Sequence, residues 1–190
     1  MKPSAPENQG SREGGKIVSS QTIYSGNEFS FRLDELILPN GRRSRQELIV
    51  YPAVVCIAAF TDDGRFVLIR QYRHAAGSVL WEAPAGKLLP GEEPDAGAKR
   101  ELQEETGYRA EQWQRLFAGY IAPGISTEWM SFFLARRLTR GSSHPDVDEC
   151  IQVQEVPMDN VRDMLNRGEI RDVKSALAVI LAMEKLKETM

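Results

Sequence analysis

The hydrophobic pattern of residues 17–50 is that of short strands rather than helices. Apolar residues alternate with polar ones, as at Phe29 and Phe31, which is typical of strands that bury one face. The dipeptide Asn40-Gly41 carries the signature of a tight hairpin turn, and residues 47–51 can return as a strand. We therefore predict a small antiparallel β unit, which is too thin to be stable alone and must pack on the rest of the chain or on a second subunit.

Continuous apolar runs replace this alternation from residue 53 onward. Residues 53–60 and 65–72 are two such runs, separated by the turn at residues 62–64, and runs of this kind indicate strands that are buried on both faces. We predict a buried hairpin here, with Cys56 as a small buried hydrophobe. A loop rich in Gly and Pro is expected over residues 84–91, and further strands over residues 78–82, 113–120, 130–138 and 151–156.

Three segments carry helical signals. The first begins at Pro94, since proline suits the first helical turn, and it ends at Gly107, a common C-terminal cap. The other two are expected over residues 158–167 and 172–187, the last with apolar residues at Val173, Ala176, Leu177, Ile180 and Leu181. Helices interspersed with strands in this way predict an α/β sandwich.

The composition fits one well-cored domain and a smaller element. The chain has 190 residues, 42% of them apolar, and a net charge of -3, which argues against nucleic acid or an anionic membrane as the main partner. No apolar run reaches the length of a membrane span. Residues 1–16 are polar and rich in Gly, Pro and Ser, so we expect a disordered tail that lacks the apolar core of a signal peptide. The two cysteines, Cys56 and Cys150, cannot form a disulfide framework, which favours the reducing cytoplasm.

The first predicted helix carries a cluster of carboxylates. Glu101, Glu104 and Glu105 are spaced i, i+3 and i+4, so they lie on one helical face. On an exposed surface each like-charge pair costs only about 0.2–0.5 kcal/mol, and a solvated acidic face is the ordinary explanation. At a partly buried site the cost rises to about 4 kcal/mol per pair at 4 Å. A hard divalent cation, Mg²⁺ or Mn²⁺, would remove that cost, since both select all-oxygen ligands.

The residues around this cluster resemble a known motif. Gly86, Glu92, the run Arg100-Glu101-Leu102, the pair Glu104-Glu105 and Gly107 occur at the spacing of the Nudix box, and the one soft departure is Tyr108, where the family usually places an aliphatic residue. The chain thus resembles the Nudix hydrolases. The resemblance implies a Nudix α/β/α sandwich with a mixed sheet over residues 51–190, preceded by the small antiparallel β domain over residues 17–50. It also implies Mg²⁺-dependent hydrolysis of a diphosphate linkage, with Mn²⁺ as a substitute.

The resemblance also assigns roles within the box. Glu101 and Glu105 would be metal ligands, Glu104 a ligand or a helper of the attacking water, and the carbonyl of Ala85 a further ligand. Arg100 would orient a glutamate without touching the substrate; the alternative is an ordinary i, i+4 pair with Glu104. Glu92 would be an occasional ligand or lie behind the ligands, or else simply favour the helix N-terminus.

Flanking segments resemble one branch of the family, the ADP-ribose pyrophosphatases. By that match, Arg73 would contact a phosphate, Glu82 would face the site, and Gly86 would lie against the substrate; the alternatives are a salt bridge for Arg73 and a solvent-exposed strand-edge charge for Glu82. Residues 120–128 match as well, and they place Pro123 and Glu128 at the substrate, although a plain Pro-Gly turn explains Pro123 equally simply.

Two further expectations come from the branch. The catalytic base lies in the loop before the strand at Ile151, where Asp146, Asp148 and Glu149 are candidates and Glu149 is favoured. The N-terminal β domain is exchanged within a homodimer. ADP-ribose is the leading substrate, and the alternatives are GDP-mannose, (d)NTPs or dinucleoside polyphosphates, or a sensor that binds a nucleotide sugar without catalysis.

Overall fold

A computed structural model describes residues 14–142 and 150–188 of the chain. The chain divides into two compact units, each described by itself: one joins the residues up to Ala53 with Gly119–Met130, and the other joins Val54–Ala118 with the residues from Ser131 onward. Residues 119–130, which lie inside the predicted 51–190 domain, therefore group with the N-terminal sheet.

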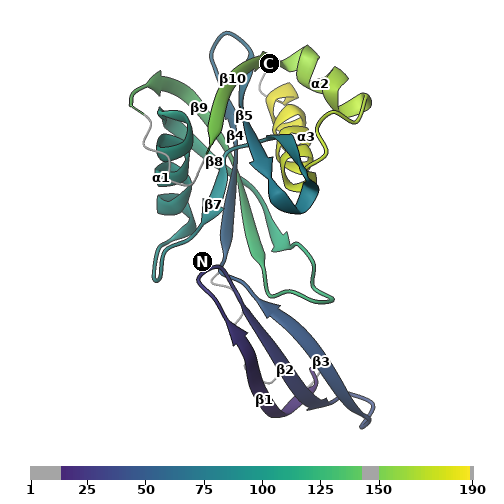
Figure 1. Ribbon diagram of the computed structural model, residues 1–190. Coiled ribbons are helices and arrows are strands. Elements are labelled where there is room, and N and C mark those ends of the chain that lie inside the picture. The colour runs from purple at the N-terminus through teal and green to yellow at the C-terminus, as the bar shows by residue number, and fades with distance from the viewer. Residues whose placement is uncertain (1–13, 143–149, 189–190) are drawn as a thin grey trace. The chain divides into compact units, whose positions relative to one another are not determined.

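The first unit is built on a three-stranded antiparallel sheet (Figure 1), formed by β1 (Lys16–Ser25), β2 (Ser30–Ile37) and β3 (Arg43–Val50) in that order. The predicted turn at Asn40-Gly41 is confirmed: Gly41 has a φ of 80° and its N–H donates to the Leu38 carbonyl at 2.8 Å. The hydrophobic pattern does not mark β1 as a separate strand, because all ten of its residues are exposed. This strand begins at Lys16, one residue inside the predicted tail.

The loop before β9 is fastened to the end of β3. The N–H of Ile49 donates to the Ile125 carbonyl at 2.8 Å, and the N–H of Thr127 donates back to the Ile49 carbonyl at 3.0 Å. The Thr127 hydroxyl accepts a further hydrogen bond from the Tyr51 N–H at 3.0 Å. These bonds explain why residues 119–130 belong to the first unit.

The second unit is an α/β sandwich around a seven-stranded mixed sheet with the strand order β10-β5-β4-β9-β8. Strand β6 pairs with β5, and β7 pairs with β4. Figure 1 shows α1 and α3 on opposite faces of this sheet. The strands are β4 (Val54–Phe60), β5 (Arg65–Arg73), β6 (Ser78–Glu82), β7 (Ala85–Lys87), β8 (Tyr108–Tyr120), β9 (Trp129–Arg140) and β10 (Ile151–Pro157); the helices are the short 3-10 turn η1 (His74–Ala76), α1 (Pro94–Thr106), α2 (Met158–Asn166) and α3 (Val173–Lys187).

Strand β4 lies in the core of the sandwich and is buried on both faces, as predicted. Its residues Val55 and Ile57 pack in one cluster with Ala98 and Leu102 of α1. Cys56 is also buried, and its sulfur contacts the Lys174 carbonyl of α3 at 3.9 Å. Because successive side chains of a strand point to opposite faces, β4 packs against α1 on one face and against α3 on the other.

Helix α1 begins and ends where the sequence predicts. Pro94 occupies the first turn, and Gly107 caps the C-terminus with a φ of 73° and an N–H that donates to the Gln103 carbonyl at 2.8 Å. Strand β8 then starts directly at Tyr108, five residues before the predicted start at residue 113. Tyr108 is buried, and its hydroxyl hydrogen-bonds the Glu155 carboxylate, so a tyrosine satisfies this position of the box.

The predicted apolar face of α3 is partly wrong. Val173 is 80% exposed and Ile180 is 47% exposed. The buried face is offset from the predicted one and comprises Ser175, Ala178, Val179, Ala182, Met183 and Leu186. Apart from Ser175 these residues are apolar and recur at helical spacing, so the sequence carries this face and the prediction had the right period with the wrong phase. Among the described residues, no helix is long and apolar enough to cross a lipid bilayer.

Candidate active site

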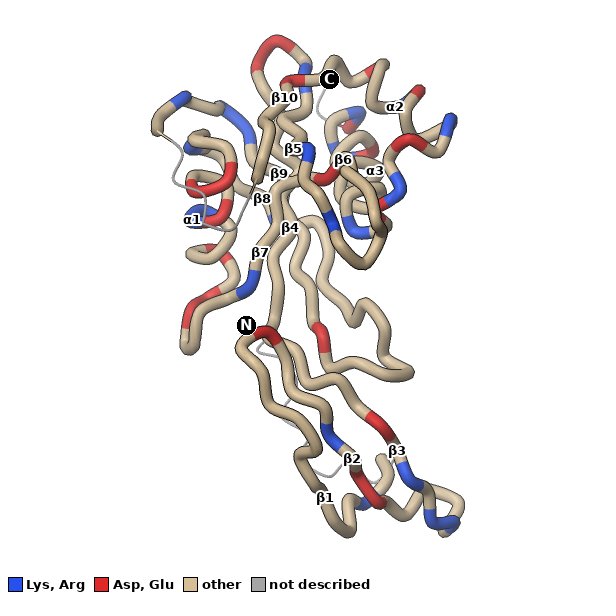
Figure 2. The backbone as a smooth tube through the Cα atoms, viewed as in Figure 1, with Lys and Arg blue, Asp and Glu red and all other residues tan. Residues whose placement is uncertain are grey.

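The loop that contains β7 lies against the glutamates of α1. The buried Glu105 carboxylate accepts a hydrogen bond from the Ala85 N–H at 3.0 Å. A Cβ atom added at Gly86 would lie 2.1–2.2 Å from the carboxylate atoms of Glu101, so only glycine leaves room for that side chain. Figure 2 shows acidic residues recurring along α1 beside β7. The structure therefore brings together four of the predicted site residues: Ala85, Gly86, Glu101 and Glu105.

Arg100 ties the glutamates of α1 to one another. Its guanidinium donates to both oxygens of Glu92 at 2.9 and 2.8 Å, to Glu101 at 2.7 Å and to Glu104 at 2.8 Å. A fifth bond of 2.9 Å reaches the carbonyl of Lys87. Arginine has five N–H donors, so all of them are used within the protein. The i, i+4 pair with Glu104 that the sequence offered as the alternative is present, and an orienting role for Arg100 in the reaction stays a prediction.

The charges around Arg100 stabilise one another. Hydrogen bonds to Glu92, and then to Glu104 and Glu101, raise the pKa of Arg100 against the opposing effect of burial. The same bond from Arg100 lowers the pKa of Glu92, assisted by the N–H of Leu89. Glu92 is therefore an ionised residue that holds the arginine and the Leu89 backbone, and its part in metal binding stays a prediction.

A second ion network surrounds Glu82, which is only 1% exposed. Arg73 binds its carboxylate through two bonds of 2.7 and 2.8 Å, and Lys174 of α3 adds a third of 2.6 Å. Burial would raise the pKa of Glu82, but these hydrogen bonds and charges outweigh it and lower the pKa. The alternative of a solvent-exposed charge for Glu82 is therefore wrong. The salt bridge considered for Arg73 is present, and its side chain stays 39% exposed.

The N-terminus of α3 extends this network. Asp172 accepts from the Lys174 ammonium at 2.8 Å and caps the helix by accepting from the Ser175 N–H at 3.1 Å. The Ser175 hydroxyl also donates to Asp172 and accepts from the N–H of Ala83 at 2.7 Å. The sequence does not predict a role for Lys174 or Ser175. The available signal was Asp172, a preferred N-cap residue three positions before a serine.

Several predicted site residues are not placed beside these glutamates. Pro123 and Glu128 lie in the first unit, in the loop between β8 and β9, where the Glu128 N–H donates to the Ser126 hydroxyl at 3.1 Å. The three candidates for the catalytic base, Asp146, Asp148 and Glu149, lie outside the described residues. Their assigned roles stay predictions.

The side chains around Gly86 suit a divalent cation by their chemistry. Glu101, Glu104 and Glu105 supply carboxylate oxygens and Ala85 a carbonyl, the ligands that Mg²⁺ and Mn²⁺ select. Glu101 and Glu104 both point to Arg100, and within residues 14–142 and 150–188 no three His, Cys, Asp or Glu side chains converge on one point. The Glu101 carboxylate occupies the space at Gly86 that a Cβ would fill, and Glu105 accepts from the Ala85 N–H, so the residue types beside this backbone fit such an ion by their chemistry.

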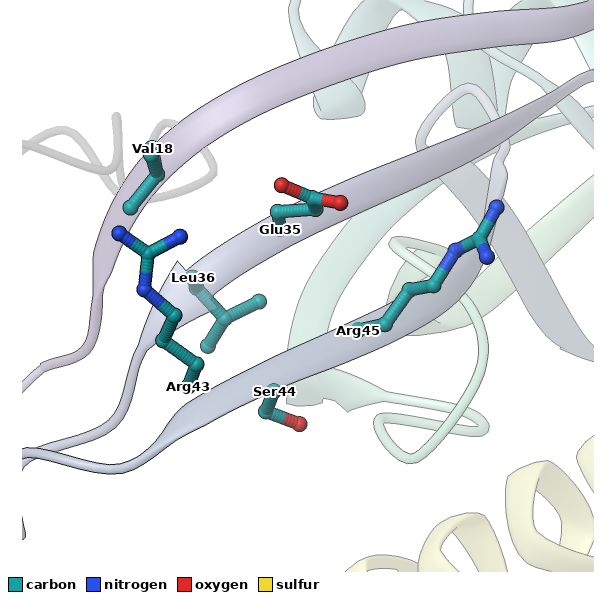
Figure 3. A pocket seen from close by; sticks show the side chains of 6 residues that line it. All are labelled: Val18, Glu35, Leu36, Arg43, Ser44 and Arg45. Carbon is teal, nitrogen blue, oxygen red and sulfur yellow. The ribbon is translucent and has the colours of Figure 1, made fainter.

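A hollow of about 260 Å³ lies elsewhere, on the N-terminal sheet (Figure 3). It is lined by Val18, Glu35, Leu36, Arg43, Ser44 and Arg45. None of these residues belongs to the predicted site, and the hollow belongs to the first unit. The carboxylates and backbone groups at α1 and β7 therefore stay the candidate site.

Several known proteins are similar to this chain in sequence. The NUDIX domain family matches residues 50–177. The chain is 35% identical over 166 residues to an ADP-ribose pyrophosphatase of Bacillus subtilis (strain 168), covering 86% of this chain and 90% of the relative. It is 37% identical over 131 residues to a GDP-mannose pyrophosphatase of Yersinia pestis (strain Pestoides F), covering 61% and 63% of the two chains.

A solved structure is similar to this chain in fold. An ADP compounds hydrolase superposes with a TM-score of 0.82 and 26% identity, covering 95% of this chain and 98% of that one. The fold predicted from the sequence, an α/β/α sandwich preceded by a small β sheet, is thereby confirmed. With the box residues gathered at α1 and β7, the chain belongs to the Nudix family and is a Nudix hydrolase.

Proposed function

We propose that this Nudix hydrolase cleaves the diphosphate linkage of nucleoside diphosphate sugars in a Mg²⁺-dependent reaction, with ADP-ribose as the preferred substrate. The observation that carries the proposal is the contact of the Ala85-Gly86 backbone with Glu105 and Glu101. It places the carboxylates of Glu101 and Glu105 against the backbone of residues 85–86. The products expected from ADP-ribose are AMP and ribose 5-phosphate.

The metal ligands would be Glu101, Glu105, Glu104 and the carbonyl of Ala85, with Mn²⁺ as a substitute for Mg²⁺. When bound, the ion neutralises negative charge on the diphosphate and lowers the pKa of water. Arg100 and Glu92 hold the glutamates in place. Water attacks one phosphorus, the bond to the bridging oxygen breaks, and the other phosphate leaves. Glu149 is the proposed general base for the water proton, assisted by Glu104.

Arg73 is proposed to bind a phosphate of the substrate. Nε and one Nη of its guanidinium hold Glu82, while its 39% exposed side chain can direct outer N–H groups to an anionic oxygen. Glu82 is buried, so we propose that it acts through Arg73. Gly86, Pro123 and Glu128 complete the proposed substrate-binding residues.

We propose ADP-ribose rather than GDP-mannose because of how much of the chain each sequence match covers. The match to an ADP-ribose pyrophosphatase covers more of this chain than the match to a GDP-mannose pyrophosphatase. We also propose that the enzyme acts in the cytoplasm, where the exposed thiol of Cys150 stays reduced; the thiol of Cys56 is protected by burial, which raises its pKa to about 12.

A substrate panel tests the proposed function. Purified protein with Mg²⁺ is incubated with ADP-ribose, GDP-mannose, UDP-glucose, diadenosine polyphosphates and dNTPs, and the products are identified by chromatography. We expect AMP and ribose 5-phosphate from ADP-ribose, at the highest kcat/KM of the panel, and no turnover in EDTA. Rapid cleavage of a triphosphate with the sugars left intact would contradict the proposal, and binding without turnover of any compound would indicate a sensor.

We further propose that the N-terminal sheet is covered by a second copy of the chain. Within the strands β1, β2 and β3 only Asp34 is buried, whereas a sheet of three strands needs an apolar face covered from water to be stable. Apolar residues exposed on the first unit include Ile17, Val18, Ile23, Tyr24 and Phe29. Exposed apolar side chains in such number on one small sheet favour contact with another chain.

Replacing Ile23 by arginine is expected to convert a dimer into a monomer. Ile23 is 51% exposed, and a buried unpaired charge at an interface is strongly unfavourable. Light scattering after gel filtration should give twice the chain mass of 21.3 kDa for the unmodified protein and the single mass for Ile23→Arg. Gln152→Arg adds the same charge at an exposed position of β10, outside the N-terminal sheet, and should stay dimeric. A single-chain mass for the unmodified protein would rule out the dimer.

A further inference from the structure

Five consecutive residues, Glu82 to Gly86, form a segment that is held from several sides. The Ala85 N–H donates to Glu105 and Gly86 lies against Glu101, both on α1. The carbonyl of Pro84 accepts from the Ile57 N–H of β4 at 2.8 Å. These bonds fix one side of the segment that carries the proposed carbonyl ligand.

The opposite side of the same segment is held by the first turn of α3. Ser175, 1% exposed, accepts from the Ala83 N–H at 2.7 Å. Lys174 binds the Glu82 carboxylate at 2.6 Å. Asp172 fixes both of these side chains, because one of its oxygens accepts from the Lys174 ammonium and from the backbone and hydroxyl of Ser175.

Packing alone does not require these polar groups. A helix start needs only a cap, which Asp172 provides to the Ser175 N–H. The Ser175 hydroxyl and the Lys174 ammonium instead reach across to residues that immediately precede Pro84 and Ala85. Without the hydroxyl, the buried N–H of Ala83 would lose the acceptor seen in the structure, and the backbone leading to Ala85 could rotate to find another.

We propose that Ser175 and Lys174 are positioning residues for the hydrolytic site, an inference that rests on the proposed function. Ser175 holds the backbone of Ala83, two residues before Ala85, whose N–H is bonded to Glu105 and whose carbonyl is the proposed ligand. Lys174 holds Glu82, which in turn holds Arg73. Helix α3 thus sets the geometry of a site to which it contributes no ligand.

The test measures metal affinity as well as turnover, with Ser175→Ala as the main variant. Groups that orient metal ligands typically change affinity or activity by about 10–100-fold. We therefore expect Mn²⁺ affinity, titrated by electron paramagnetic resonance, to fall by about tenfold or more. The kcat should fall by a similar factor while the KM for ADP-ribose at saturating metal stays within about twofold, since binding residues are untouched. Ser175→Thr keeps a hydroxyl and should restore most of both quantities.

A matched control separates positioning from loss of stability. Ala182, fully buried in α3, can be replaced by glycine, which weakens the same helix without touching residues 82–86. If Ala182→Gly lowers the melting temperature as much as Ser175→Ala and lowers Mn²⁺ affinity equally, the proposal is overturned. It is also overturned if folded Ser175→Ala binds Mn²⁺ like the unmodified protein.

The proposal can still be tested if Ser175→Ala does not fold or if the protein hydrolyses no nucleotide sugar. If Ser175→Ala does not fold, Asp172→Asn tests the Lys174 arm, because asparagine caps helices as well as aspartate but removes the charge that holds Lys174. The KM for ADP-ribose should then rise several-fold through Glu82 and Arg73, and an unchanged KM would refute the role. If the unmodified protein binds Mn²⁺ but hydrolyses no nucleotide sugar, the proposed substrate fails, whereas the Mn²⁺ titrations still judge the positioning role.

Discussion

Glu105→Gln is expected to lower kcat for ADP-ribose by roughly 10²-fold or more, the scale of losing one group that stabilises charge in a transition state. The substitution removes one negative charge from the proposed metal ligands. It keeps an amide oxygen that can still accept the hydrogen bond from Ala85, seen at 3.0 Å to the carboxylate. The fold should therefore change little, with a free energy of unfolding within about 1 kcal/mol of the original.

Steady-state kinetics with Mg²⁺, together with urea unfolding, measure both quantities. Glu111→Gln on β8 is the matched control, because it makes the same chemical change at an exposed glutamate of the same unit and should leave turnover as it was. A Glu105→Gln enzyme with near-normal kcat would show that this carboxylate holds no essential ion.

Gly86→Ala is expected to reduce kcat about as strongly, by roughly 10²-fold, although it adds only one methyl group. The new Cβ would meet the Glu101 carboxylate at 2.1–2.2 Å, so either the carboxylate or the loop must move by about 1 Å. Displacements of that size can cost about 10²-fold in rate. The half-saturating Mg²⁺ concentration should rise as well, because Glu101 is a proposed ligand.

Gly141→Ala provides the comparison for this variant. A Cβ there would meet only the backbone carbonyl oxygen of Gly107, at 3.3 Å, so packing beyond the end of α1 is disturbed while the Glu101 carboxylate is not. We expect a changed melting temperature with nearly unchanged Mg²⁺ dependence. Equal losses of kcat in the two variants would mean that crowding at Gly86 acts through stability and not through the carboxylate.

The glutamate face of α1 could be predicted because it depends only on local spacing. Glu101, Glu104 and Glu105 must share a face of any helix, and Pro94 and Gly107 mark where that helix begins and ends. The buried hairpin of β4 and β5 could also be predicted from the sequence, since short continuous apolar runs typically form strands that are buried on both faces.

The α3 network could not be predicted from the sequence in this way. Ser175 and Lys174 lie 92 residues from their partners Ala83 and Glu82, so their contacts depend on where the last helix lands on the sheet. The same contacts bury the polar side chain of Ser175 in α3. Strand β1 was hidden for a related reason, because a strand with every residue exposed carries no alternation of burial.

The attachment of residues 82–86 limits how this family member can vary. Each of the five residues contacts α1, α3, β4 or β5 at a fixed step along the backbone. Inserting or deleting a single residue would shift every later partner by one position and reverse the side to which it points. Substitutions around this stretch are therefore compatible with the fold. Insertions or deletions within it are not, unless α1 and α3 change position as well.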